Sequence, residues 1–286
     1  MSHIKRAWIV LSLMAIVAML AAACQPQVVE KTVEVEKEVE VTREIEVEVE
    51  KTVEVEVPPP PAGPEGTLVR AISTFPNSLD LPQCAERQAS TTAWQLYDSL
   101  VWLNDDNEIE PALAESWDIS EDGREYTFHL REDVAFHNGD PFNADAVVFS
   151  WNHAVEGDYE YSDQWREADS VEKIDEYTVK VTTPDPNVLF LANMADSWAM
   201  IPPGFEPENP IGTGPYKFVE WVKGDHITME ANLDYWRGAP KIQTVIFRPI
   251  PESATRVAAI QTGEVDIVTR LSSEEAQSLL GVENVK

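Results

Sequence analysis

The chain has 286 residues, with 51 acidic and 21 basic side chains and a formal net charge of −30 at pH 7. Phosphate groups repel so acidic a chain, which excludes nucleic acid as a partner and excludes a protein that lies flat on an anionic membrane. Two cysteines make no disulfide framework, but 43% hydrophobic residues and nine tryptophans suit a globular fold with a sizeable core.

The first residues predict a secretory signal. Lys5 and Arg6 precede an uncharged apolar run from residue 7 to 23, and Cys24 follows the run directly. The sequence LAAAC resembles the lipobox of bacterial lipoproteins, in which the cysteine receives a diacylglycerol. We therefore expect a lipoprotein signal peptide over residues 1–23 and lipid on Cys24. An uncleaved membrane anchor is the alternative, because the apolar run has the minimum length for a span.

Residues 24–65 predict an extended linker. Between Val29 and Val57 every valine and isoleucine has an odd number, and all eleven glutamates have even numbers. A period of two excludes an amphipathic helix and a coiled coil, and the segment is longer than the strands of globular sheets. Repulsion between its carboxylates favours a solvated chain, which a run of prolines ends at residues 58–61.

Strands and helices are both predicted after the linker. Strands are expected at 67–73, 126–130, 244–250 and 265–268, and hairpins with turns at 175–176 and 223–225. Helices are expected over about 90–100, after Asn143, over 252–263 with a stop at Gly263, and after Ser272, which has capping-box spacing to Glu275. This mixture predicts an α/β or α+β fold with a mixed sheet.

No catalytic constellation is visible. The five histidines lack metal-ligand spacing to another histidine or a cysteine, and the sequence NDDNE at 104–108 lacks the glycine and the closing glutamate of a calcium loop. The sequence GTG at 212–214 is no phosphate loop, and as a structural element it predicts a tight turn with positive φ. No nucleophile elbow or cysteine–histidine pair is present, and carboxylate pairs are uninformative in so acidic a chain. We expect no enzyme, no metal site and no cofactor.

Six motifs between residues 67 and 268 carry a family resemblance: ALAESW, YTFHLR, FHNGDPF, GTGPY, DYWRGAP and GEVDI. Their order is similar to that in the extracellular solute-binding proteins of the oligopeptide, dipeptide and nickel type (family 5), which serve ATP-driven (ABC) importers. The resemblance implies a type II periplasmic-binding-protein fold, with two lobes around a cleft that holds a peptide or similar small solute. It also implies a permease as partner and a position outside the cytoplasmic membrane, to which the lipid would anchor the chain.

Members of that family have about twice this folded length. The resemblance therefore implies a first lobe at residues 66–270, with a sub-lobe inserted at about 97–198, while residues 271–286 begin the crossover to a second lobe that is absent. The residues that hold a peptide's termini in the family lie mostly in that second lobe, so ligand identity does not carry over. The alternative is a non-transport surface lipoprotein whose lobe docks another protein or a separately encoded second half.

Six residues are candidates for the edge of the cleft. They are Cys84, Glu86 and Arg87 in the loop after the first strand, Trp198 in the sequence SWA, and Thr213 and Gly214 in GTG. Each also has a structural interpretation: a small loop residue for Cys84, solvated loop charges for Glu86 and Arg87, a core aromatic for Trp198, and turn residues for Thr213 and Gly214.

Overall fold

The computed structural model describes residues 63–84, 87–282 and 285. The chain divides into two units, Met1–Pro58 and Pro59–Lys286, and all described residues belong to the second unit. The predicted signal peptide, most of the predicted linker and the candidate Glu86 lie outside the described residues. Among those that are described, no helix has both the length and the apolar character needed to cross a membrane.

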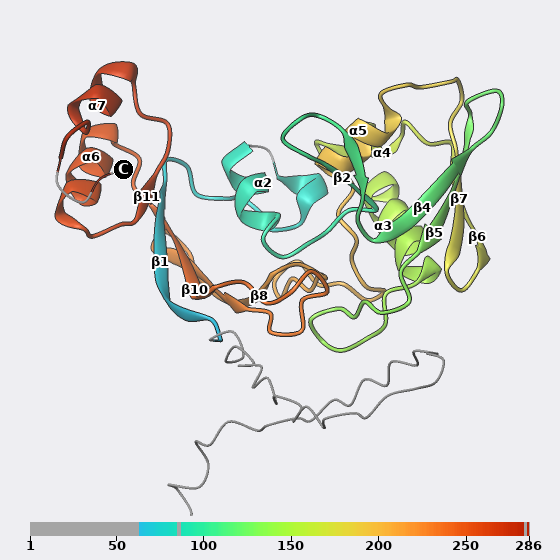
Figure 1. The fold of residues 1–286 in the computed structure, drawn as a ribbon, viewed down its shortest axis with the longest axis horizontal. Helices are drawn as coiled ribbons and strands as arrows, with labels where there is room; N and C mark the ends of the chain where they lie inside the picture. The colour runs from blue at the N-terminus through green and yellow to red at the C-terminus, as the bar shows by residue number, and fades with distance from the viewer. Residues whose placement is uncertain (1–62, 85–86, 283–284, 286) are drawn as a thin grey trace, which may run out of the picture. The chain divides into compact units, whose positions relative to one another are not determined.

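A mixed five-stranded sheet joins the two ends of the described chain, with strand order β11-β1-β10-β9-β8 (Figure 1). β1 pairs in parallel with β10 and with β11, whereas β9 pairs antiparallel with both β10 and β8. The strands are β1 (Glu65–Ile72), β8 (Tyr216–Val222), β9 (His226–Ala231), β10 (Ile242–Pro249) and β11 (Ile267–Val268). The predicted mixed sheet and the hairpin with its turn at 223–225 are confirmed.

A second, antiparallel sheet is built from a continuous middle part of the chain. Its strand order is β4-β5-β7-β6, and a short hairpin of β2 and β3 precedes it. The strands are β2 (Val101–Leu103), β3 (Ile109–Pro111), β4 (Ala114–Ile119), β5 (Glu125–Leu130), β6 (Ser170–Asp175) and β7 (Thr178–Thr182). Gly123, at φ +71°, lies in the turn between β4 and β5, and the predicted turn after Asp175 joins β6 to β7.

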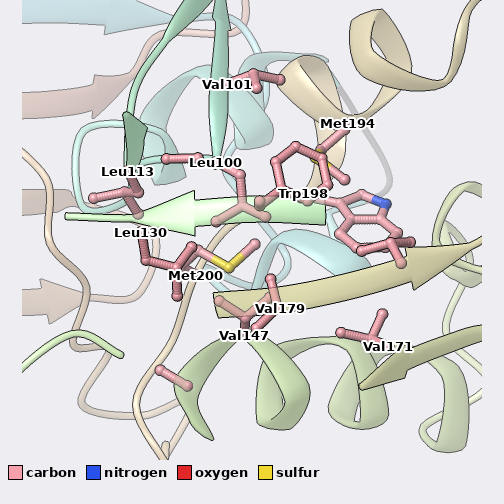
Figure 2. Close-up of a cluster of buried hydrophobic side chains, with 14 of the residues drawn as sticks. Leu100, Val101, Leu113, Leu130, Val147, Val171, Val179, Met194, Trp198 and Met200 are labelled. Carbon is pink, nitrogen blue, oxygen red and sulfur yellow. The ribbon is translucent and has the colours of Figure 1, made fainter. Parts of the chain in front are cut away.

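Each sheet has its own hydrophobic core. In the core of the antiparallel sheet, Val147 of helix α3 (Ala144–Glu156) packs with Val179 of β7 and with Trp198, and Figure 2 shows these side chains together. The core of the five-stranded sheet contains Met229 of β9 and Phe247 of β10. Apolar burial contributes about 25 cal/mol per Å² to such cores.

The helix ends follow local capping rules. The Asn143 side chain accepts a hydrogen bond from the Asp145 amide at the start of α3, and Gly263 ends α6 in the left-handed conformation. Ser272 and Glu275 form the predicted capping box of α7. The helices are 3-10 helix η2 (Leu81–Gln83), α2 (Arg87–Ala93), α3 (Ala144–Glu156), α4 (Ser162–Trp165), α5 (Phe190–Ser197), α6 (Ser253–Thr262) and α7 (Ser273–Ser278).

The C-terminal end of the first predicted helix is wrong, because α2 ends at Ala93 rather than near residue 100. The cause lies in a distant segment. The carbonyl of Gln95 accepts a hydrogen bond from the Tyr216 amide, and that of Leu96 accepts one from the Gly214 amide. Both carbonyls accept hydrogen bonds from residues more than a hundred positions away. They are therefore not available as acceptors for the amides of a longer helix.

Arg256 connects the segment before α6 to the segment after β11. Its buried guanidinium donates hydrogen bonds to the carbonyls of Ile250 and Pro251 before α6 and of Thr269 and Arg270 after β11. A buried guanidinium is stable only when its donors are satisfied, and here four carbonyls satisfy them.

Candidate functional site

Two adjoining cavities form the candidate site, one of about 260 Å³ and the other of about 380 Å³. Trp94 and Asp196 line both cavities, so these two side chains mark the junction between them. Both volumes are close to the lower end of the range for small-molecule sites. We call the two cavities together the groove.

The first cavity lies between α2, α4 and α5. It is lined by Leu81, Cys84, Ser90, Thr91, Trp94, Tyr161, Gln164, Trp165, Asp196 and Ser197. Hydroxyl and amide groups alternate here with apolar walls, which is the composition of sites that enclose a small solute and fix its orientation by a few polar contacts.

Trp165 supplies an unpartnered donor in the wall of the first cavity. Its side chain is buried, and its indole Nε1 has no hydrogen-bond partner among the described residues. A buried donor without a partner costs about 1–3 kcal/mol. Because the Trp165 ring lines the first cavity, a ligand carbonyl or carboxylate that reached this N–H would remove that cost.

Trp198, a predicted cleft residue, lies behind Trp165. The two rings stack at 4.8 Å with an interplanar angle of 8°, and the Trp198 indole donates to the carbonyl of Gln164 at 3.2 Å. Trp198 is fully buried and does not line either cavity. It therefore supports the groove from the core, and a direct ligand contact stays a prediction.

Cys84 lines the first cavity with a protonated thiol. Burial, and after it the nearby Asp80 carboxylate, raise the pKa of Cys84 to about 12. Its Sγ donates weakly to the carbonyls of Ser78 and Asp80. A thiol of this kind is neither a ready nucleophile nor a ready metal ligand at neutral pH. A polar contact of Cys84 with a solute stays a prediction.

A buried hydrogen bond connects the loop before α2 to α3. Asp80 Oδ2 lies 2.8 Å from His153 Nε2, and both side chains are largely shielded from solvent. The Tyr97 hydroxyl donates to the carbonyl of Leu79 in the same loop. These contacts attach the wall of the first cavity to both cores.

The second cavity is lined by four aromatic side chains and contains a buried carboxylate. It is lined by Trp94, Gln95, Tyr97, Asp98, Ser99, Trp102, Leu103, Ala195, Asp196, Pro215 and Tyr235. Aromatic rings provide large, rigid apolar surfaces for a bound solute.

Asp98 connects two of the sequence motifs, GTGPY and DYWRGAP. It accepts hydrogen bonds from Thr213 Oγ1 at 2.9 Å, from the Tyr235 hydroxyl at 2.9 Å and from Trp236 Nε1 at 3.0 Å. Burial raises the pKa of Asp98, while its three donors and the charge of Arg237 act in the opposite direction. The hydroxyl of the candidate Thr213 thus binds a protein carboxylate, and its contact with a solute stays a prediction.

The GTG sequence does not form a positive-φ turn, so that expectation is wrong. Gly212 and Gly214 are absent from the described glycines with positive φ, and they are needed for close approach instead. A Cβ on Gly212 would lie 2.0 Å from the Leu96 carbonyl oxygen, and one on Gly214 would lie 2.5 Å from the Leu96 carbonyl carbon. The absence of side chains lets this segment pack directly on the backbone beside the groove.

His137 binds the GTG segment through both of its ring nitrogens. Its Nδ1 accepts a hydrogen bond from the Gly212 amide at 3.3 Å, so Nε2 carries the proton and donates to the Gly214 carbonyl at 3.0 Å. Burial lowers the pKa of His137 to about 4, which keeps the ring neutral at pH 7. The Asn232 side chain donates to the same Gly214 carbonyl.

Sequence reasoning missed most of the groove's lining, including Trp94, Asp98, Trp165 and Asp196. One of them has a recognisable signal, since Asp196 places an acid in the last turn of a helix, where acids are disfavoured. The candidates Glu86 and Arg87 lie in the sequence between Cys84 and Ser90, which line the first cavity, but the position of their own side chains is not described. Within residues 63–84 and 87–282 no cluster of three or more metal-ligating side chains is found.

Comparison with known proteins identifies the family. The model for bacterial extracellular solute-binding proteins, family 5 Middle, matches residues 108–286. The chain is 34% identical over 223 residues to the glutathione-binding protein GsiB of Pectobacterium atrosepticum, covering 74% of this chain and 43% of GsiB. It thus spans about half the length of the curated relatives it matches.

Two solved structures have the same fold. The periplasmic binding protein DppA of Helicobacter pylori, in complex with the peptide STSA, matches with a TM-score of 0.70 and 33% identity over 77% of this chain and 49% of DppA. The oligopeptide-binding protein AppA of Bacillus subtilis, in complex with a nonapeptide, matches with a TM-score of 0.73 and 27% identity over 78% of this chain and 47% of AppA. These relatives are binding proteins and not enzymes. The chain belongs to the bacterial extracellular solute-binding proteins of family 5 and has the mixed α/β fold of about half of such a protein.

Proposed function

We propose that the chain is a membrane-anchored extracellular receptor that delivers peptides or similar small solutes to the permease of an ABC importer. The observation that carries this proposal is the groove, whose two cavities combine aromatic walls, hydroxyl and amide groups and the unpartnered Trp165 N–H. Binding in such a site needs no covalent step, because polar groups of the wall replace the water around the solute.

The relatives support peptides as the solute class. GsiB is named for binding glutathione, and the structures of DppA and AppA contain the peptide STSA and a nonapeptide. A peptide offers backbone carbonyls to a donor such as Trp165 Nε1, and it offers side chains to the aromatic second cavity.

The anchor and the linker define where the receptor works. We assign lipid attachment to Cys24, residues 24–65 to a linker and residues 66–270 to the solute-binding lobe. Fully extended at ~3.3 Å per residue, the segment between Val29 and Val57 spans roughly 95 Å, far enough to let the lobe reach solute and then a permease in the same membrane.

Titration of the full chain in detergent with the tetrapeptide Ser-Thr-Ser-Ala tests the proposal, with tryptophan fluorescence as readout because Trp94, Trp102 and Trp165 line the groove. Saturable binding is expected, and Trp165→Phe, which removes the N–H, should weaken it about threefold to tenfold. Trp117→Phe is the matched control, because Trp117 packs on the antiparallel sheet's core and does not line the groove.

Absence of saturable binding, or equal weakening by both variants, would contradict a solute site in this groove. If the full chain instead captured a separately produced second half of a family member without binding the peptide, the alternative of a docking surface protein would be favoured.

A further inference from the structure

Asp196 is the one uncompensated charge in the described lining of the groove. Its exposed carboxylate makes no hydrogen bond or ion pair with another described residue, although it lines both cavities. Among the described residues, Asp98 is the only other charged residue that lines either cavity, and three side-chain donors already occupy its oxygens.

Asp196 lies at the end of its helix where a negative charge is unfavourable. It lies in the last turn of α5 (Phe190–Ser197), where the helix dipole is negative and where α5 has no basic residue. A carboxylate there is unfavourable for helix stability, whereas a bound cation would be attracted by both the carboxylate and the helix end. Residues that break such local rules tend to occur at functional sites.

The surrounding aromatic rings favour a cation at the junction of the cavities. Trp94 lines both cavities together with Asp196, and indole is the side chain that attracts cations most strongly through its π face. Trp102, which lines only the second cavity, already has Arg237 at 5.2 Å from its ring centre, and Arg237 partly offsets the charge of Asp98. The uncompensated negative charge is therefore at the Trp94–Asp196 junction.

We infer that this junction is a subsite for a positively charged group of the solute, an ammonium or a guanidinium, paired with Asp196 beside Trp94. The inference rests on the proposed function and deepens it: the preferred solutes are cationic peptides or small cationic solutes of similar size. An oxygen of the same ligand accepts the Trp165 N–H in the first cavity, so the junction and the first cavity recognise opposite features of one molecule.

Two tripeptides that differ in one charge test the inference. They are Ala-Lys-Ala and the same peptide with its lysine Nζ acetylated, titrated against the full chain in detergent. The acetyl group removes the charge and keeps the chain length, so an exposed ion pair with a cation–π contribution predicts about threefold to tenfold tighter binding of Ala-Lys-Ala. The preference should diminish as salt is added.

Asp196→Asn should abolish this preference, whereas the control Asp133→Asn, which removes an exposed charge that does not line the groove, should retain it. The unfolding temperature of Asp196→Asn should equal or exceed that of the unmodified chain, because the unfavourable carboxylate at the helix end is gone. Binding of both peptides without discrimination, or a preference that persists in Asp196→Asn, would overturn the cationic subsite alone. Failure of both peptides to bind would overturn the proposed function as well.

Discussion

The contact between His137 and the GTG segment predicts that acid destabilises the lobe through one side chain. In the folded chain Nδ1 accepts from the Gly212 amide and Nε2 donates to the Gly214 carbonyl, so the ring must be neutral. Protonation would place a second N–H against the Gly212 amide. Lowering the pH from 7.0 to 4.5 should therefore cost stability that a variant without this histidine does not lose.

The magnitude follows from the pKa. Burial lowers the pKa of His137 from 6.5 to about 4, so between these values the unfolded chain binds more protons and stability falls as the pH falls. At pH 4.5 linkage gives an upper bound of about 2.5 kcal/mol. Because part of the ring reaches solvent, we expect about 1–2 kcal/mol.

Urea unfolding followed by tryptophan fluorescence at pH 7.0, 5.5 and 4.5 measures the effect, with His137→Gln as the comparison. Many carboxylates titrate in the same range, so the informative quantity is the difference in unfolding free energy between the two proteins. His137→Gln should be less stable at pH 7.0, and this difference should shrink by about 1–2 kcal/mol at pH 4.5. A difference that stays constant across this range would refute the argument from the neutral ring.

Four further predictions concern other parts of the chain. Cys24→Ala should release the protein from the membrane fraction; retention would show an uncleaved anchor instead. Limited proteolysis should cut within residues 29–57 before it cuts within 67–268, and protection of 29–57 would contradict the linker. Peptides should bind this chain about a thousandfold more weakly than they bind a complete two-lobe receptor, and the chain should self-associate through apolar surface. Calorimetry measures the binding and a size measurement the self-association; micromolar binding by a monomer would contradict this prediction. Gly214→Ala should destabilise the lobe by about 1–3 kcal/mol in urea unfolding, because its Cβ would lie 2.5 Å from the Leu96 carbonyl carbon, whereas Gly63→Ala, with nothing within 4 Å, should be nearly neutral.

Features with local causes could be predicted from the sequence. The capping residue Asn143, the helix stop at Gly263 and the capping box of Ser272 and Glu275 depend on neighbours within a few positions, and the structure has all of them. The hairpins could be predicted for the same reason, because their alternating apolar and polar residues and their turn residues lie in one short stretch of the chain. The mixed sheet follows from the order of these elements.

The groove could not be predicted in this way, because its residues meet only after folding. Trp94 and Asp196 are separated by about a hundred positions, and Asp98 finds its donors beyond residue 212. The family resemblance pointed to Cys84 and to the sequence SWA, of which Cys84 and Ser197 line the first cavity, but not to Trp94, Asp98 or Asp196. The early end of α2 has the same origin, since the distant amides of Tyr216 and Gly214 donate to the carbonyls of Gln95 and Leu96.

The pairing of β1 sets an order in which the chain can fold as it is synthesised. Glu65 in β1 aligns with Ile242 in β10, and Arg70 aligns with Ile267 in β11, so β1 has no partner in its sheet until nearly the whole chain has emerged. The antiparallel sheet needs only Ala114–Thr182 and can form earlier, because closing short loops is fast and closing long ones is slow. During that interval the apolar side chains of β1 stay uncovered, and a holding chaperone would be most useful to this strand.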